Sequence, residues 1–221
     1  MRTYYNRIAG QSLERLAALS DGIFAVALTL LVLDLHTPVS RVLHIEQPLW
    51  TSGALQSELV LWDALSRLWP SLLTYFMSFL TLGIFWVGQQ TQLNHFVRSD
   101  RHLTWIHLTF LLAVSLMPFS TALLAAFITY RLALVVYWLN LLLLGAALFG
   151  SWRYAQHSRL IKDEATTEML SANERRIVIW QALYAFAVLL CIFNTYVSIV
   201  LLILMQLNSA IAPRIGPLYR I

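Results

Sequence analysis

The residues best suited to chemistry lie where the first long apolar stretch begins, at Arg15, Ser20, Asp21 and Gly22. A charged side chain near hydrocarbon costs several kcal/mol unless it is paired or hydrated, so the acid and the arginine indicate a function or a specific contact. An equally weighted alternative is that Ser20 and Asp21 cap the N-terminus of a helix. At the far end of the stretch, Asp34 either attracts cations or reaches interfacial water.

Helical spacing divides the rest of this stretch into two faces. One face holds residues that are three or four positions apart, namely Gly22, Val26, Thr29, Leu30 and Leu33. A second face, about 100° round the axis, holds Asp21, Ala25, Leu28 and Val32. A Val/Leu stripe with one threonine usually packs against another helix or lipid, and Thr29 can bond the carbonyl one turn back. Spacing alone therefore leaves the role of the first face open.

The remaining reactive residue types form no recognisable catalytic or metal-binding pattern. His95, His102 and His107 are spaced by seven and five residues, which does not place all three on one helical face. There is no His-Glu-x-x-His, Gly-x-Ser-x-Gly, phosphate-loop or dinucleotide-binding pattern. The single cysteine, Cys191, lies in an apolar stretch and is interpreted as a small buried hydrophobe. The sequence predicts no enzyme, no metal site and no cofactor.

The elements that must position these residues are apolar helices. The chain is 59% hydrophobic and 12% charged, about half the charged share of a soluble domain. Stretches of roughly 20 apolar residues, each enough to cross a bilayer, recur between short polar segments. We predict an all-α integral membrane protein with one domain, residues 1–221. The six expected spans cover residues 16–35, 65–87, 103–127, 132–152, 177–193 and 196–212.

The last two spans depend on a break at Asn194-Thr195, with a re-entrant pair or one long tilted helix as alternatives. Six spans put twelve of the 15 lysines and arginines on the side of both termini, and leave only Arg41, Arg67 and Arg131 on the other. The positive-inside rule then predicts cytoplasmic N- and C-termini and supports the break. It also explains the net charge of +4 without nucleic acid as a partner.

The first span carries a family likeness. Arg-x-x-x-Leu-Ser-Asp-Gly, which begins at Arg15, resembles the Arg-x-x-x-Phe-Ser-Asp signature of the bacterial relatives of the lysosomal potassium channel, transmembrane protein 175. The likeness continues at Phe85-Trp86, at Arg98-x-Asp100 and through residues 103–112 and 117–121. The chain departs from the pattern at Leu19, where the signature has phenylalanine. It departs again at Gln89-Gln90, where relatives often carry histidines, so the polar network between the first three helices is not assured.

The resemblance implies a homotetramer in a bacterial plasma membrane, with a central pore lined by the first helix of each subunit. It implies a potassium-permeable cation channel with K⁺ as the permeant ion and modest selectivity over Na⁺. Val26 is expected to form the narrowest apolar ring, with Leu30 and Leu33 further along and Thr29 offering a hydroxyl. Asp34 is expected at the outer mouth.

Arg15, Ser20 and Asp21 are assigned to a polar network that holds the first helix against its neighbours at the cytoplasmic end. Its candidate partners are Trp86, Asn94, His95, Asp100 and His107. The runner-up function is a secondary transporter of protons or a small solute. Such transporters usually show internal repeats and ionisable groups near the middle of the membrane, and the sequence shows neither. A membrane enzyme or scaffold has only the scattered histidines in its favour.

Overall fold

The chain folds into a bundle of long helices. The computed structural model describes residues 12–33, 35–36, 50, 54–162 and 167–211. Side chains are described in these ranges except at 54–57 and 167–170. In chain order the helices are α2 (Leu13–Leu33), α3 (Ala54–Ser66), α4 (Trp69–His95), α5 (Arg101–Ala126), α6 (Arg131–His157), α7 (Thr167–Leu189), the 3-10 turn η1 (Leu190–Ile192) and α8 (Thr195–Ile211).

Local sequence explains where the central helices begin. Pro70 lies in the first turn of α4, where its missing N–H is not needed. Asp100 caps α5, because its Oδ1 accepts a hydrogen bond from the Leu103 N–H at 2.8 Å. The connection between α4 and α5 is held by that between α6 and α7, since the Val97 N–H donates to the Leu160 carbonyl at 2.8 Å. Both connections therefore lie at one end of the bundle.

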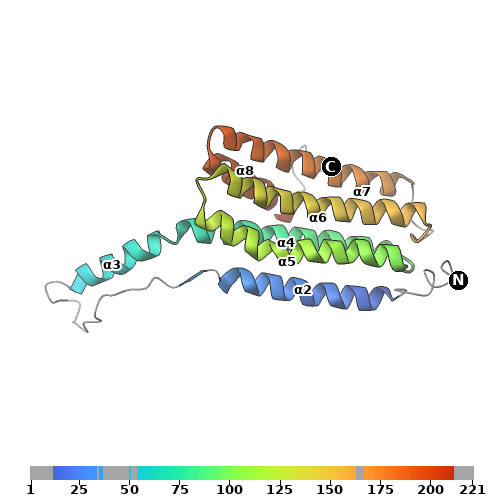
Figure 1. Ribbon diagram of the computed structural model, residues 1–221, viewed down its shortest axis with the longest axis horizontal. Helices are drawn as coiled ribbons and strands as arrows, with labels where there is room; N and C mark the ends of the chain where they lie inside the picture. Colours follow the sequence, from blue (N-terminus) through green and yellow to red (C-terminus); the bar gives the residue numbers. More distant parts are fainter. Residues whose placement is uncertain (1–11, 34, 37–49, 51–53, 163–166, 212–221) are drawn as a thin grey trace.

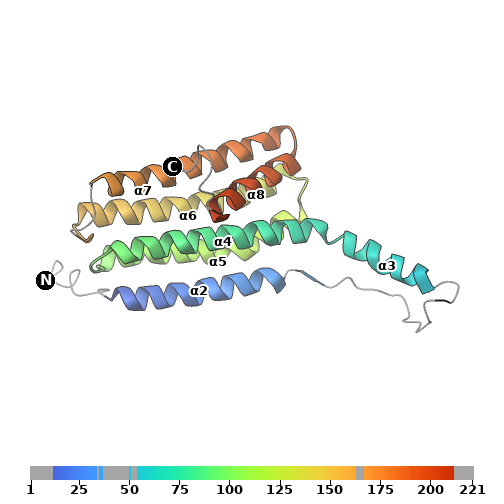
Figure 2. The same cartoon turned by 180° about the vertical axis from the view of Figure 1, so that it is seen from behind.

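Within the bundle, α2 lies on one side and α7 lies on the opposite side (Figures 1 and 2). α2 packs on α4 and α5, α6 packs on α5, and α7 packs on α6 and α8. α8 returns across the bundle to cover α4. Because α2 has neighbours on one side only, much of its surface is left uncovered within the subunit.

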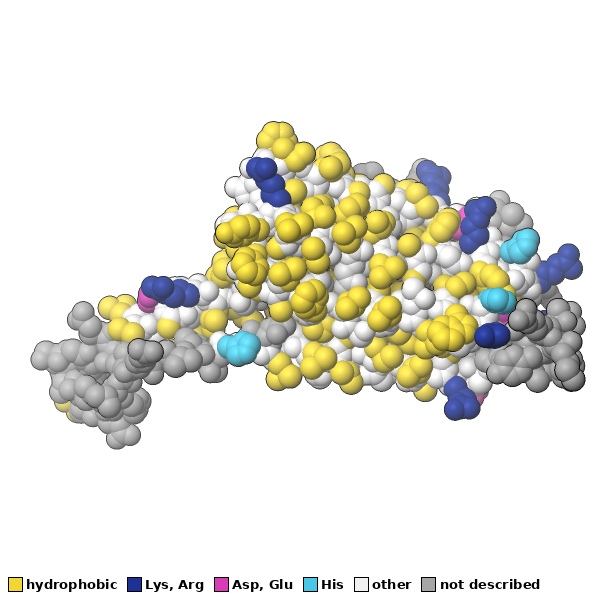
Figure 3. All heavy atoms as spheres, viewed as in Figure 1, with side chains coloured by type: hydrophobic (Ala, Val, Ile, Leu, Met, Phe, Trp, Pro, Cys, Tyr) yellow, Lys and Arg dark blue, Asp and Glu magenta, His cyan; other side chains and the backbone are white. Residues whose placement is uncertain are grey.

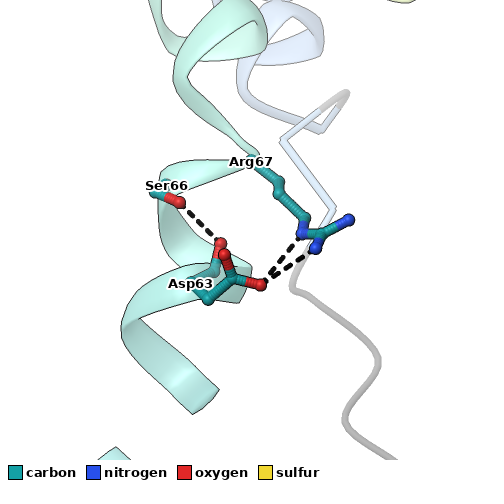
Figure 4. Close-up of polar contacts among 3 residues, drawn as sticks. All are labelled: Asp63, Ser66 and Arg67. Atoms are coloured by element: carbon teal, nitrogen blue, oxygen red, sulfur yellow. Dashed lines mark hydrogen bonds and ion pairs between the residues drawn. The ribbon is translucent and has the colours of Figure 1, made fainter. Parts of the chain in front are cut away.

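Residues 36–64, which lie between the first two expected spans and were expected to be a loop, are not a loop throughout, because α3 occupies the second half of this segment. α3 extends beyond the end of the bundle (Figure 1). Its last turn is closed by Arg67, whose Nε and Nη2 donate to Asp63 Oδ2 at 3.1 and 3.0 Å (Figure 4). Both side chains are well exposed, so this ion pair adds little stability.

Within the described residues, five helical segments are long and apolar enough to cross a membrane: Leu13–Leu33, Trp69–His95, Arg101–Ala126, Arg131–His157 and Ser171–Ile192. The final apolar helix, α8, has 17 residues, a length of about 25 Å. It starts at Thr195 after a break that follows η1, so the stretch that begins near Ile177 is two helices and not one. Figure 3 shows an apolar surface over the middle of the bundle, with most of the charged side chains toward its ends.

Candidate functional site

The buried side of α2 is the side that packs on α4 and α5. It consists of Leu16, Ser20, Phe24, Ala27 and Leu31. Phe24 is only 2% exposed, and its ring lies 5.9 Å from that of Phe110. α2 begins at Leu13, where Ser12 Oγ accepts from the Arg15 backbone N–H at 3.2 Å. The interpretation of Ser20 and Asp21 as helix caps is therefore wrong, because both lie well inside the helix.

The opposite side of α2 is open within the subunit. It contains every residue of the predicted pore stripe, namely Val26, Thr29, Leu30 and Leu33, together with Gly22. Val26 is 57% exposed and Leu33 is 67% exposed. Gly22, Val26 and Leu30 also line a groove of 690 Å³ between α2 and α5, whose α5 side includes Leu108 and Leu112. No described helix covers the stripe, which is an exposed apolar surface.

The hydroxyl of Thr29 is used within the helix, where Thr29 Oγ1 donates to the Val26 carbonyl at 2.8 Å. This is the backbone bond anticipated as the ordinary alternative for this residue. Since the hydroxyl proton is engaged, the lone pairs of Oγ1 remain available on the exposed surface. Thr29 can therefore accept from water or coordinate a cation, but its proton is not free.

A buried chain of polar side chains joins α2 to the bundle through Ser20. Gln89 Nε2 donates to Ser20 Oγ at 2.8 Å and lies 3.4 Å from His107 Nδ1. His107 Nε2 lies 3.2 Å from Ser151 Oγ. All four side chains are almost completely buried. If the Gln89 amide supplies both protons, His107 Nδ1 is an acceptor and Nε2 carries the proton toward Ser151.

Asp21 forms a second link, at the edge of the buried side. Its Oδ1 accepts from the indole Nε1 of Trp86 at 2.8 Å and from Gln90 Nε2 at 2.9 Å. Both donors come from α4, one helical turn apart. A carboxylate that accepts two N–H groups forms stronger bonds than a neutral acceptor would. Asp21 thus secures α2 to α4 next to the Ser20 contact.

Other members of the predicted network lie elsewhere. Asp100 caps α5 and its Oδ2 accepts from Tyr154 Oη at 2.6 Å. His95 Nδ1 lies 2.7 Å from the Thr91 carbonyl in its own helix. The side chain of Arg15 is exposed and makes no ion pair with any described residue, and Asn94 is exposed as well. The structure thus brings together Ser20, Asp21, Trp86 and His107, but not the rest.

Sequence reasoning missed the residues that connect these groups. Gln89 and Gln90 drew attention only as departures from the family pattern, yet they bridge α2 to α4 and to His107. Their position three and four residues after Trp86, on the same helical face, was the available signal. Ser151 lies on α6, and nothing in the sequence links it to His107. Asp34 lies outside the described residues, so its place at the outer mouth stays a prediction.

A separate hydroxyl cluster ties the other helices together. Tyr137 Oη on α6 lies within 3.3 Å of Ser78 Oγ and 3.1 Å of Thr81 Oγ1 on α4. Thr121 Oγ1 on α5 donates to Ser78 at 2.7 Å, and Gln206 Nε2 on α8 donates to Thr81 at 2.6 Å. α2 takes no part in these bonds, so its polar attachment depends on the Ser20 and Asp21 contacts.

Comparisons with known proteins agree with this arrangement. A sequence profile of the family described as endosomal/lysosomal potassium channel TMEM175 matches residues 15–118, which include most of α2, all of α3 and α4, and most of α5. A potassium channel of Streptomyces collinus is 34% identical over 142 residues, covering 62% of this chain and 62% of the relative. The match therefore spans less than two thirds of that relative.

Another relative matches over more of its length. A potassium channel of Chamaesiphon minutus is 29% identical over 189 residues, covering 84% of this chain and 87% of the relative. The human endosomal/lysosomal proton channel TMEM175 is 30% identical over 109 residues, which is 20% of its length. The crystal structure of a lysosomal potassium-selective channel TMEM175 homolog from Chamaesiphon minutus superposes with a TM-score of 0.74 at 25% identity. It covers 90% of this chain and 96% of that one.

The matched segment begins at Arg15 and contains the hydrogen bonds from Ser20 and Asp21 to α4. Together with several helices long enough to cross a bilayer, these matches identify a multi-pass membrane protein. In sequence over residues 15–118, and in fold over most of its length, the chain is similar to members of the TMEM175 family.

Proposed function

We propose that this chain forms a homotetrameric, potassium-permeable cation channel whose pore is lined by α2 of each subunit. Two bacterial relatives bear the name potassium channel, and the superposed structure is described as potassium-selective. The observation that carries the proposal is the apolar, exposed stripe of α2, opposite the side that packs inside the subunit.

One α2 helix cannot enclose a pore, so the stripe needs further copies of the chain. A closed ring of four gives each copy the same neighbours. The exposed surface of α2 is wide enough both to line a pore and to contact a neighbouring copy, because Ala25 and Val32 are exposed as well as Val26 and Leu33. Val26 and Leu33 would face the axis, and residues beside them would contact the next copy.

A ring of Val26 side chains would act as a hydrophobic constriction, with Leu30 and Leu33 extending the apolar wall. Such a ring gates by dewetting, because a dehydrated ion gains nothing from hydrocarbon. It offers no carbonyl oxygens in place of the hydration shell. Selectivity would therefore be modest, and would depend on pore width and on the free lone pairs of Thr29.

The contacts of Ser20 and Asp21 would hold α2 in position so that the stripe faces the axis. Gln89, Gln90 and Trp86 on α4 supply the donors. Arg15 lies on the exposed side of α2, where a partner in the tetramer would come from another copy. The polar contacts thus position the wall and do not line it.

We further propose that the protein lies in a bacterial plasma membrane with both termini in the cytoplasm and with α8 as a sixth span. Most described basic residues belong to the end at which α2 begins, whereas Arg67 and Arg131 belong to the other end. The positive-inside rule makes the first end cytoplasmic. The short α8 would cross with local thinning of the bilayer or with help from its neighbours.

The deciding experiment measures potassium and sodium flux in liposomes for the wild type, Val26→Asn and Val32→Asn. Val26→Asn should raise flux about tenfold, since polar side chains lower the dewetting barrier. Val32→Asn makes the same chemical change on the neighbouring face and should change flux little. Slow, saturable exchange would favour the secondary transporter, and equal effects of the two variants would refute the pore assignment.

The mass of the protein in mild detergent gives an independent test. Four copies per particle are expected for the wild type, and Val26→Asn should leave that number unchanged because the pore wall is not the main contact. A stable monomer that still conducts in liposomes would contradict the proposed architecture.

A further inference from the structure

A second groove is bounded by α4, α7 and α8, with Leu148 of α6, and has a volume of 460 Å³. No residue of α2 lines it, although its α4 wall includes Trp86, the donor to Asp21. Two glycines of α4, Gly83 and Gly88, form part of its wall. A Cβ at Gly83 would have no heavy atom within 4 Å, so the space beside this residue is open. The predicted pore stripe on α2 contributes nothing to this groove.

The groove changes character along its length. α4 and α7 run in opposite directions, so Phe79 and Tyr184 belong to one end and Gln92 and Asn173 to the other. The first end is apolar and aromatic. The second end also holds Arg176, and it lies toward the end of the bundle at which α2 and α7 begin (Figure 1). The groove thus has an apolar body and a polar, cationic mouth.

The polar mouth contains hydrogen-bonding groups that have no partner among the described residues. Gln92 is 2% exposed, and its Nε2 donates to the Leu148 carbonyl at 3.1 Å, but its Oε1 has no partner among the described residues. The buried Nδ2 of Asn173 likewise has none. An unmet acceptor and an unmet donor are costly in an apolar protein interior, so a ligand that pairs with both would be stabilised at this site.

The charge at the mouth, on Arg176, is positive, and no described acidic residue forms an ion pair with it. The nearest acid along α7, Glu174, lies 3.7 Å from Arg153 on α6 and is neutralised there. Arg175, the adjacent basic residue, does not line the groove. A guanidinium beside a free amide donor suits a phosphate group.

We propose that this groove binds one anionic phospholipid with a hydroxylated headgroup, of the phosphatidylglycerol type. The phosphate would accept from Arg176 and Asn173, and a headgroup hydroxyl would donate to Gln92 Oε1. An acyl chain would follow α4 past Gly88 and Gly83 toward Phe79. A soluble phosphate could use the mouth but would leave the apolar body empty, which is why a lipid is the better occupant. Basic pockets between membrane helices bind anionic headgroups in this way.

Native mass spectrometry of the oligomer, purified from membranes that contain phosphatidylglycerol and phosphatidylcholine, tests the proposal. The wild type should retain one phosphatidylglycerol per subunit in preference to phosphatidylcholine. Arg176→Gln should lower this occupancy about tenfold, because one charge-assisted contact is lost. Arg175→Gln removes the same charge one residue away and should retain the lipid.

A second pair of variants tests the apolar body. Gly83→Leu places a side chain in the open space of the groove and should displace the lipid, whereas Gly150→Leu, at another open glycine on α6, should not. Both variants should keep the wild-type oligomeric mass. Lipid binding does not depend on ion conduction. A Gly83→Leu variant that loses the lipid but keeps the wild-type ion flux would therefore still support the proposed lipid site.

Several outcomes would overturn the proposal. Equal losses in Arg175→Gln and Arg176→Gln would indicate diffuse charge at the membrane surface. Retention of glycerol 3-phosphate instead of lipid would indicate a soluble anion. Absence of bound lipid, combined with dissociation of the oligomer in Gly83→Leu, would indicate that a neighbouring copy fills the groove.

Discussion

The two sides of α2 differ in burial although they belong to one helix. On the buried side, Phe24 and Leu31 are 2% and 1% exposed and pack into the main core. On the open side, Val26 and Leu33 are 57% and 67% exposed, and no described helix covers them. Both sides are apolar, so hydrophobicity does not distinguish them.

The difference between the sides comes from polar groups at their boundary. Ser20 and Asp21 set the rotation of α2 by binding donors on α4. Once that rotation is set, the remaining aliphatic residues fall on one side or the other by helical spacing alone. A few hydrogen bonds thus decide which residues form core and which are available to other copies of the chain.

The largest effect is expected from Phe24→Ala. Truncation of this buried ring, which packs against Phe110, should lower the free energy of unfolding by about 3 kcal/mol. Leu30→Ala, on the open side proposed to line the pore, should change it by about 0.5 kcal/mol or less. Denaturant unfolding of the detergent-solubilised protein measures both. Equal destabilisation would mean that the two sides are not distinct.

Gln89→Leu should cost about 2 kcal/mol of unfolding free energy, because it removes the donor to Ser20 and leaves buried polar groups without partners. Gln90→Leu is the matched control, since Asp21 keeps the Trp86 indole as a donor. That variant should cost about 0.5 kcal/mol. Thermal unfolding in one detergent compares the two glutamines, and a larger loss at Gln90 would reverse their proposed ranks.

Asp21→Asn should lower the free energy of unfolding by about 1 kcal/mol, because the two N–H donors from α4 lose a charged acceptor. Asp63→Asn on α3 provides a control, since its contact with Arg67 is exposed and worth little. The same unfolding assay serves for both. If the α3 variant were the more damaging, the positioning role of Asp21 would be refuted.

Thr29→Val should have the smallest effect. The isosteric change removes a hydroxyl whose proton is already bonded to the Val26 carbonyl. We expect no loss of stability and a change of about twofold in the potassium-to-sodium flux ratio, which corresponds to about 0.4 kcal/mol. Thr91→Val on α4, whose hydroxyl bonds the Val87 carbonyl in the same way, should leave the ratio unchanged.

Much of the helical architecture could be predicted because membrane spans are coded locally. Apolar length, polar interruptions and the positions of arginines are visible without knowledge of any contact. The break near Asn194 is an example, since charge counting favoured it and the helices end and begin there. α3 was missed because its apolar residues lie between polar ones in a segment too short to span a membrane. Pro38, Pro48 and Gly53, which precede it, favoured a loop.

The candidate site also has a part that could be predicted from the sequence and a part that could not. Helical spacing was enough to group Val26, Leu30 and Leu33 on one face, and that face is exposed. The partners of Ser20 and Asp21 were not predictable, because Gln89 and Gln90 are each 69 residues further along the chain. The resemblance to the family did not predict these two glutamines as partners, since histidines are common at their positions in relatives.

The sequence by itself determined that α2 has two apolar faces with a polar group at their boundary. Tertiary structure alone decided which face is buried, which glutamine bonds Ser20, and that α4, α7 and α8 enclose a groove with unmet polar atoms. The physical reason is that periodicity relates residues a few positions apart, whereas contacts between helices depend on their mutual rotation and packing.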